Sequence, residues 1–166
     1  MAQIRTWSGL MKALEKETEK AVEYAGDQIK KILHDNVQHL WYNARGDAYQ
    51  YSRTYEVINS ITLETLKQGK GGYTARIYFD ENKISPRISE NGGFNSHMSL
   101  NGDTSWGGRS LASLVVEFME LGQNSPVYSY DGAHFVEATY ETAKEDAVYL
   151  IEESLNRAGF ATVVVR

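Results

Sequence analysis

The chain contains no cysteine, which excludes disulfide bonds, thiolate nucleophiles and cysteine metal ligands together. It has only two prolines, and 42% of its residues are hydrophobic, so we expect a folded chain and not a disordered one. No apolar run reaches the roughly 18 residues that a membrane-spanning helix needs. The polar stretch from Met1 to Leu10 does not have the pattern of a signal peptide. We therefore expect a protein that neither spans a membrane nor follows that secretion route, and the absence of cysteine suits the cytoplasm.

Basic residues are outnumbered by acidic ones, 17 to 22, which leaves a formal charge of −5. A protein that binds nucleic acid broadly needs clustered lysine and arginine to neutralise phosphates. Lysines do recur along the first predicted helix, at Lys12, Lys16, Lys20, Lys30 and Lys31. Acidic residues interleave with them, so the pattern favours a solvated helix face over a nucleic-acid-binding surface.

Two long amphipathic helices are predicted near the ends of the chain. Apolar residues recur with a helical period from Leu10 to about Leu40, with Ser8 as a candidate N-cap. A second such pattern runs from Val136 to Leu155, with Gly159 as its stop signal. On the first helix, Asp27 and Lys31 are spaced to form an ion pair.

A β-hairpin is predicted between these helices. Apolar side chains alternate over residues 61–65 and again over 73–79, around the glycine-rich turn of residues 68–72. A short apolar helix from Leu111 to Leu121 is predicted to end at Gly122, followed by a turn-rich connection over residues 123–132. Residues 161–165 are typical of a terminal strand. The predicted fold class is α+β, with long N- and C-terminal helices packed on a small, mainly antiparallel sheet, in a single domain spanning residues 1–166.

The segment from Asp80 to Arg109 shows little periodicity and is unusually long for a loop in a compact domain. Its many glycines and asparagines predict a flexible backbone. It also carries apolar side chains, which a plain linker does not need, and we interpret it as an arm that becomes ordered against a partner. The candidate interface residues are Phe94, Met98, Leu100, Trp106 and Arg109, with Trp106 the strongest of them.

No catalytic, cofactor-binding or metal-binding residues are assigned from the sequence. The segment Gly69-Lys70-Gly71-Gly72 lacks the spacing of a phosphate-binding loop. His34 and His39 fall on different helix faces; Asp35 and His39 share one face, but no third metal ligand accompanies them. The alternative function is a small hydrolase in which the long loop acts as a lid. Its acid and base would come from Glu117, Glu120, His97 and His134.

Two stretches resemble a family of phage proteins. The segment Arg53-Thr54-Tyr55-Glu56-Val57-Ile58-Asn59-Ser60-Ile61 resembles Asp-Thr-Gly-x-Leu-Arg-x-Ser-Ile in the tail-completion, or head-tail joining, proteins of long-tailed double-stranded DNA phages. Thr54, Ser60 and Ile61 match, whereas Arg53 and Tyr55 replace Asp and Gly. The segment from Leu111 to Phe118 resembles that family's Tyr-Ala-x-x-Val-Glu-Phe, although Gly122 comes three residues later than usual. The family's Pro-Phe-Leu-x-Pro-Ala segment corresponds at most to His134-Phe135-Val136.

This resemblance covers about residues 10–160, in the same order of elements. It implies a structural virion protein of the neck, assembled in the bacterial cytoplasm, which completes or terminates the tail and joins it to the head connector. It further implies a homo-hexameric ring that contacts the head connector or adaptor and the tail tube or tail terminator. DNA would pass through the lumen without specific binding, and neither an enzymatic activity nor a cofactor is expected.

Overall fold

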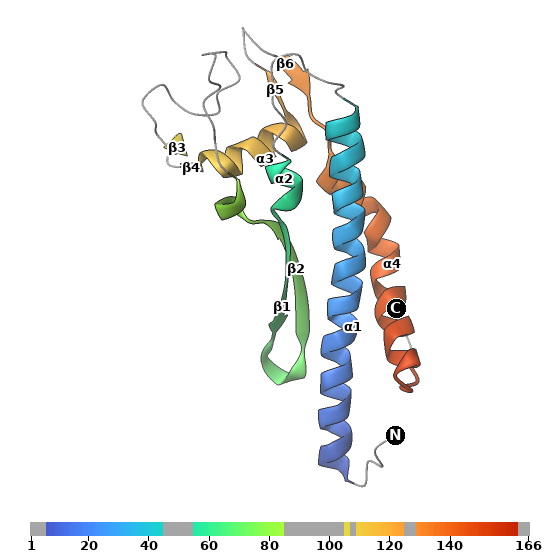
Figure 1. Ribbon diagram of the computed structural model, residues 1–166. Coiled ribbons are helices and arrows are strands. Elements are labelled where there is room, and N and C mark those ends of the chain that lie inside the picture. Colours follow the sequence, from blue (N-terminus) through green and yellow to red (C-terminus); the bar gives the residue numbers. More distant parts are fainter. Residues whose placement is uncertain (1–5, 45–54, 85–104, 107–108, 125–128, 163–166) are drawn as a thin grey trace. The chain divides into compact units, whose positions relative to one another are not determined.

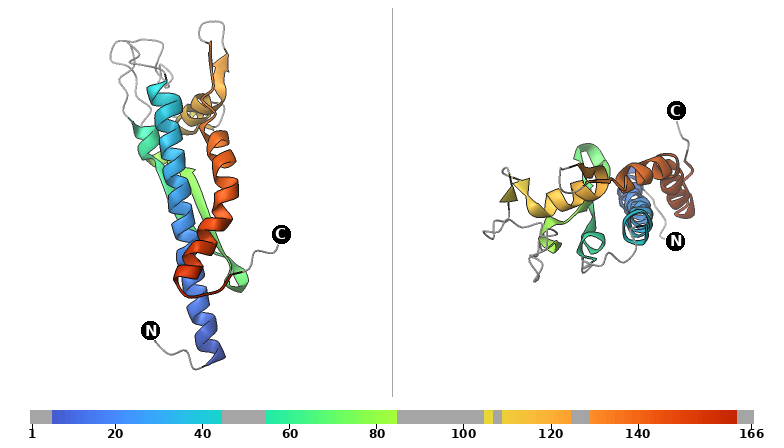
Figure 2. Two further views of the ribbon diagram at one scale, coloured as in Figure 1. Left: turned by 90° about the vertical axis from the view of Figure 1, so that its right-hand side faces the viewer. Right: turned by 90° about the horizontal axis from the view of Figure 1, so that it is seen from above.

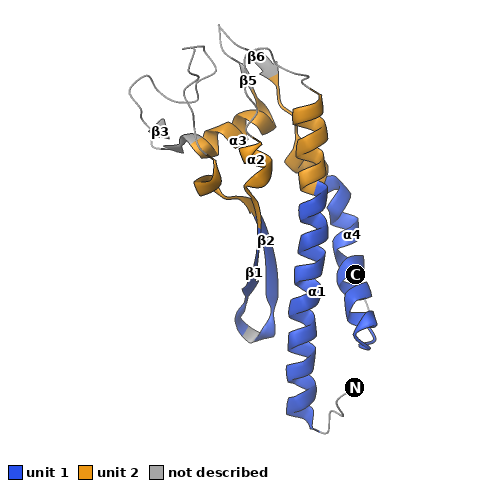
Figure 3. Cartoon of the chain, in the orientation of Figure 1, with its two compact units in different colours: residues 1–32, 63–77, 141–166 blue, residues 33–62, 78–140 orange. Residues whose placement is uncertain are grey.

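The computed structural model describes residues 6–44, 55–84, 105–106, 109–124 and 129–162 (Figure 1). Long N- and C-terminal helices pack on a small two-stranded antiparallel sheet, which confirms the α+β fold class. The chain divides into two compact units (Figure 3). Unit 1 comprises residues 1–32, 63–77 and 141–166, and unit 2 comprises residues 33–62 and 78–140. Whether the chain is one domain stays a prediction.

Unit 1 contains most of α1 (Trp7–Asn36), the outer part of the β1–β2 hairpin and most of α4 (Phe135–Arg157). Within this unit α1 lies between the hairpin and α4 (Figures 1 and 2). Helix and hairpin approach closely at Gly26, where an added Cβ would lie 2.8 Å from Leu63 Cδ1 and 2.9 Å from Ala75 Cβ. A glycine is therefore required on α1 for the hairpin to pack at this depth.

The long first helix is confirmed, but its N-cap is Thr6 and not Ser8. The Thr6 hydroxyl accepts a hydrogen bond from the backbone N–H of Gly9 at 3.1 Å. Ser8 lies inside the first turn, where its side chain cannot cap the free N–H groups. The predicted pair between Asp27 and Lys31 is present at 2.9 Å.

The helix also extends beyond its predicted end. From Val37 to Asn43 the chain continues as a π-helix, and the N–H of Ala44 donates to His39 O at 3.2 Å. Val37 and Tyr42 are buried in this segment. A π-helix turns by less per residue than the roughly 100° of an α-helix. The faces of this segment therefore cannot be assigned from the α-helical period that applies to α1.

The predicted hairpin is confirmed as β1 (Ile61–Lys67) and β2 (Tyr73–Phe79). Its turn is a single 3₁₀ turn, η2 (Gly69–Gly71), in which Gly71 has a φ of 79° that glycine adopts without strain. Next to the turn, Lys67 forms an ion pair with Glu15 of α1. That hydrogen bond and the charge of Glu15 raise the pKa of Lys67 above its usual value.

Unit 2 contains α2 (Glu56–Asn59), η3 (Glu81–Lys83), β3 (Ser105–Trp106), β4 (Arg109–Ser110) and α3 (Leu111–Leu121). α3 has the predicted bounds, and Gly122 ends it with a φ of 82°. The segment after α3, expected to be a turn-rich connection, forms an antiparallel hairpin of β5 (Gly122–Asn124) and β6 (Ser129–Asp131). These strands are short and polar, so the sequence contains no apolar alternation that would have indicated them.

Two further boundaries differ from the prediction. The loop expected from Asp80 begins with folded residues, because the Asp80 carboxylate accepts a hydrogen bond from the N–H of Asn82 at 3.1 Å and Ile84 is buried. At the other end of the chain, Ala161 and Thr162 are not in a strand, and residues 163–166 lie outside the described part. In the described residues no helix has the length and apolar character needed to cross a membrane.

Candidate assembly site

The junction of α2 and β1 contains the described part, residues 55–61, of the first stretch that resembles the phage family. Tyr55 precedes α2 with φ 54° and ψ 17°, in the left-handed region that glycine occupies most easily. Its ring stacks on that of Tyr42, with 4.7 Å between the ring centroids. This stacking helps to hold Tyr55 in a backbone conformation that is unfavourable for residues other than glycine. Residues 45–54, which include Arg53 and Thr54, lie outside the described part of the chain.

Ser60 and Ile61, which match the family pattern, are both buried at this junction. The Ser60 hydroxyl donates a hydrogen bond to Val57 O at 2.7 Å. This bond gives the buried hydroxyl a partner and occupies a carbonyl of α2 near its C-terminal end. Ser60 O in turn accepts from the N–H of Asp80 at 2.9 Å, which fixes the start of η3 against the end of α2. The matched residues therefore have a structural role: they set the geometry from which β1 departs.

The second phage-like stretch lies on α3, where Ala112, Leu114, Val115 and Met119 are buried. At the end of this helix the Glu120 carboxylate accepts hydrogen bonds from the N–H groups of Val136 and Glu137, at 3.0 and 3.3 Å. Glu120 thus caps the first turn of α4, a favourable place for a negative charge.

Three of the four residues predicted for a hydrolase, Glu117, Glu120 and His134, lie in the described part of the chain. Glu117 and Glu120 are one turn apart on α3, as expected from their spacing, but Glu120 is engaged in capping. His134 has a φ of 50°, is exposed, and lies 3.5 Å from the Glu137 carboxylate. His97 falls outside the described residues. Among the described catalytic candidates, the structure therefore shows a helix cap at Glu120 and an exposed histidine beside a carboxylate, and it places no acid–base pair in a cleft.

The predicted arm residues lie mostly beyond the described part of the chain. Phe94, Met98 and Leu100 fall in residues 85–104 and stay predictions. Trp106 and Arg109 are opposite each other in the antiparallel pair of β3 and β4. Their contribution to an interface also stays a prediction.

Histidines and lysines of α1 and its π-helical extension are at the surface. His34 and His39 are exposed, and His39 Nδ1 lies 2.8 Å from Asp35 O. Of the lysines considered for nucleic acid, Lys20 pairs with Glu17 at 2.8 Å and Lys31 pairs with Asp27. Across the described ranges, no three side chains of His, Asp or Glu are grouped so that they could hold a metal ion.

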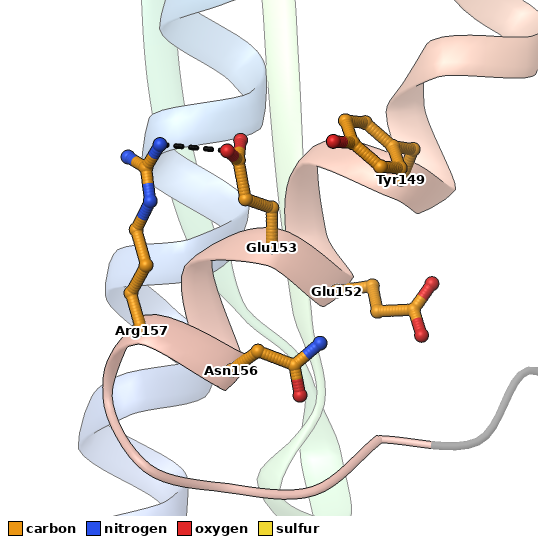
Figure 4. Close-up of a pocket in the computed structure, with 5 residues that line it drawn as sticks. All are labelled: Tyr149, Glu152, Glu153, Asn156 and Arg157. Carbon is orange, nitrogen blue, oxygen red and sulfur yellow. Dashed lines mark hydrogen bonds and ion pairs between the residues drawn. The ribbon is translucent and has the colours of Figure 1, made fainter.

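A shallow depression on α4 is lined by Tyr149, Glu152, Glu153, Asn156 and Arg157 (Figure 4). Glu153 and Arg157 point toward each other and pair at 2.6 Å. All of its lining residues come from one helix, so the depression does not enclose a small molecule on several sides. Its exposed tyrosine is a residue type that is enriched in protein–protein contacts.

Sequence reasoning missed a set of exposed apolar side chains on α1 and α4. Those in unit 1 are Trp7, Met11, Val148 and Tyr149. A helical period shows that such residues share a face with others, but it does not show where the neighbouring elements end.

The chain matches no protein-family model, and no curated protein or solved structure shows significant similarity to it.

Proposed function

We propose that the protein is a structural subunit of a phage neck, which completes or terminates the tail and joins it to the head connector as part of an oligomeric ring. The observation that carries this proposal is the backbone at Tyr55. The family pattern has glycine at this position, and Tyr55 adopts a φ of 54°, which glycine favours. A chance match of letters would not require a left-handed residue there.

The matched serine and isoleucine support the same alignment. Both are buried where α2 passes into β1, and Ser60 bonds to the end of α2 and to the start of η3. Residues that hold such a junction in place are needed by the fold itself. Their match to the family pattern therefore supports the proposal that this chain and the family have the same fold. The order of a long first helix, hairpin, second motif and closing helix agrees with that architecture.

The surface chemistry also suits an assembly protein. The described residues include exposed apolar side chains on two helices, and the chain carries a net charge of −5. Exposed apolar groups are typical of surfaces that contact other proteins. A negative balance suits a ring through which DNA passes, because acidic residues repel phosphate and do not retain it.

The first test is the mass of the purified chain, measured by light scattering over a wide range of concentration, together with electron micrographs of the same sample. We expect a mass near six subunits and closed rings with a central channel. A chain that stays monomeric at every concentration would contradict ring formation by the free protein. It would also justify a screen of hydrolase substrates.

A second measurement separates assembly from catalysis. If the chain turned over a substrate, and if Glu117→Gln removed that turnover without changing folding or mass, the hydrolase would replace the neck ring. A gel shift with double-stranded DNA provides the remaining control. We expect no shift, since the described lysines are interleaved with acids.

A further inference from the structure

One face of α1 carries residues spaced alternately by four and three positions: Trp7, Met11, Leu14, Thr18, Ala21 and Ala25. This is the spacing of a helix-packing seam. Burial changes sharply along the seam: Ala21 and Ala25 are 0% and 3% exposed, whereas Trp7 and Met11 are 75% and 47% exposed. The seam therefore continues toward the N-terminus beyond the residues at which it is covered.

The open part of this seam, the N-terminal segment of α1 (Trp7–Leu14), has a distinct chemistry. It contains no acidic residue, and its charged side chain is Lys12. The start of a helix adds a partial positive charge from its free N–H groups. The ion pair between Glu15 of α1 and Lys67 of the hairpin lies one residue beyond this segment. The segment thus combines an exposed tryptophan and methionine with a positive potential.

The outward side of α4 in unit 1 has the opposite character. The acidic face of α4 is defined by Glu141, Glu145, Val148, Tyr149 and Glu152. Glu141 pairs with Lys144, and Glu152 accepts a hydrogen bond from the Thr162 hydroxyl at 3.2 Å, so the net negative charge of the face comes from Glu145 and Glu152. By helical period this face lies opposite Ala143, which is buried. Val148 and Tyr149 are 51% and 61% exposed, and they lie one turn from Glu145 on one side and Glu152 on the other. Figure 4 shows the Glu152 carboxylate pointing away from Glu153 and Arg157.

We propose that these two surfaces bind each other between copies of the chain, so that the N-terminal segment of α1 in one copy docks on the acidic face of α4 in the next. The two surfaces are complementary in charge, and each offers apolar side chains that are exposed within its own unit. Tryptophan and tyrosine are the residue types that most often dominate such contacts. Acidic side chains near the start of a helix are stabilised by its dipole.

The geometry of this contact has a consequence for assembly. Because the two surfaces are different, the contact is heterologous, and a bound pair of copies keeps one free surface of each kind, one on each copy. Repetition of such a contact closes into a ring or continues as a filament. The inference deepens the proposed function, on which it rests for closure into a ring, whereas the contact itself can be tested separately.

The absence of cysteine makes the test direct. We would prepare Met11→Cys and Tyr149→Cys separately, mix them under reducing conditions, and add a short thiol-specific bifunctional cross-linker to the full-length proteins. We expect a covalent dimer in the mixture and little in either variant alone. A chain with both substitutions should give a ladder of covalent oligomers. The matched control is Glu23→Cys mixed with Tyr149→Cys, because Glu23 is exposed on the side of α1 away from the seam.

Three outcomes would overturn the contact. The first is an equal yield of dimer in the Glu23→Cys control. The second is a dominant dimer of Met11→Cys with itself, which would mean that two N-terminal segments pair symmetrically. The third is no cross-linking at the highest soluble concentration, with the wild-type chain monomeric in the same sample.

A substitution without any cross-linker gives an independent reading. Trp7→Ala should weaken self-association on the order of tenfold or more in sedimentation experiments, as expected for a central aromatic side chain. Tyr140→Ala is the control, since Tyr140 is 65% exposed on α4 but lies outside the acidic face. Equal affinities for the two variants would contradict the proposal.

Failure of the contact and failure of the ring are distinguishable. Closed rings in micrographs without a Met11–Tyr149 cross-link would leave the neck ring in place and exclude this interface. A specific cross-link in assemblies that remain open filaments would establish the interface and exclude the closed ring.

Discussion

The two stretches of the α1 seam have the same spacing and opposite surroundings. Ala21 and Ala25 are buried, whereas Trp7 and Met11, about four and three turns before Ala21, are 75% and 47% exposed. The larger side chains occupy the exposed stretch, and the small ones occupy the covered stretch. Small residues let the neighbouring elements approach α1, as the close contact at Gly26 also shows.

This contrast shows that a helical period defines a face but not what covers it. Burial of large apolar side chains stabilises a fold by about 1.5–3 kcal/mol each, so a chain gains little by exposing Trp7 and Met11 unless another surface receives them. The covered stretch accordingly contributes to folding, and we propose that the open stretch contributes to association. Four predictions test this difference.

The largest expected effect comes from placing the same charge on both stretches. Ala21→Asp should lower the free energy of unfolding by about 3 kcal/mol or more, because it buries a carboxylate without a partner. Met11→Asp should change the stability of the monomer by less than about 0.5 kcal/mol. Urea unfolding, followed by circular dichroism at low protein concentration, measures both. Equal losses would mean that Met11 is covered within its own chain, and the comparison would fail.

The close approach at Gly26 gives the next largest effect. Gly26→Leu should destabilise the fold by about 2 kcal/mol, because the new side chain must displace Leu63 and the Cβ of Ala75. The control is Gly69→Ala, since a Cβ at Gly69 meets no atom within 4 Å. Thermal unfolding of both variants tests the difference. If Gly26→Leu were as stable as the control, the hairpin would not pack on α1 at this point.

A smaller effect is expected at the start of the open stretch. Thr6→Ala should cost about 1 kcal/mol, because it removes the hydroxyl that accepts from the N–H of Gly9. Ser8→Ala should cost much less, since Ser8 is not the cap. Amide hydrogen exchange in the first turn of α1 would show the local loss. A larger loss with Ser8→Ala would restore Ser8 as the N-cap.

The smallest effect concerns a polar contact whose strength depends on pH, unlike the apolar seam. The hydrogen bond from the N–H of Asn82 lowers the pKa of Asp80 below its usual value of 3.8. A lowered pKa means that ionised Asp80 stabilises the fold at pH values above 3.8. This contribution is lost as the pH falls through the lower, folded-state pKa.

The measurement is the difference in melting temperature between the wild-type chain and Asp80→Ala. This difference should shrink on acidification. A repeat with Met11→Ala should give a difference that does not depend on pH in the same way. A constant gap for Asp80→Ala, well below pH 3.8, would show that the carboxylate is not stabilised in the fold.

Regular elements with strong periodicity could be predicted because their signals are local. The bounds of α3 followed from an apolar run that ends at Gly122, and the β1–β2 hairpin followed from alternation on both sides of a glycine-rich turn. The β5–β6 hairpin could not be predicted in this way, because its short strands carry no apolar alternation. They are defined by the antiparallel pairing of their backbones. The same applies to Ile84, whose burial depends on elements distant in sequence.

The candidate sites were predicted only in part. Glu120 was recognised as one of a pair of acids on α3, but its role as the cap of α4 depends on where α4 begins relative to α3. The loop residues chosen as interface candidates were found by composition, and most lie outside the described part of the chain. The exposed seam residues of α1 were missed because the sequence around Trp7 does not indicate where along α1 the hairpin ends. That position is marked by the ion pair between Glu15 and Lys67, two residues that are far apart in the sequence.

The amino-acid sequence by itself determined the α+β class, the two long helices, the hairpin turn at Gly71 and the stop at Gly122, because each depends on backbone preferences and on short-range periodicity. The tertiary structure decided which apolar residues are covered. It buried Ala21 and Ala25, left Trp7 and Met11 exposed, and joined Glu120 to the start of α4. The physical reason is that burial and capping are relations between distant segments, and a local pattern contains only one side of each.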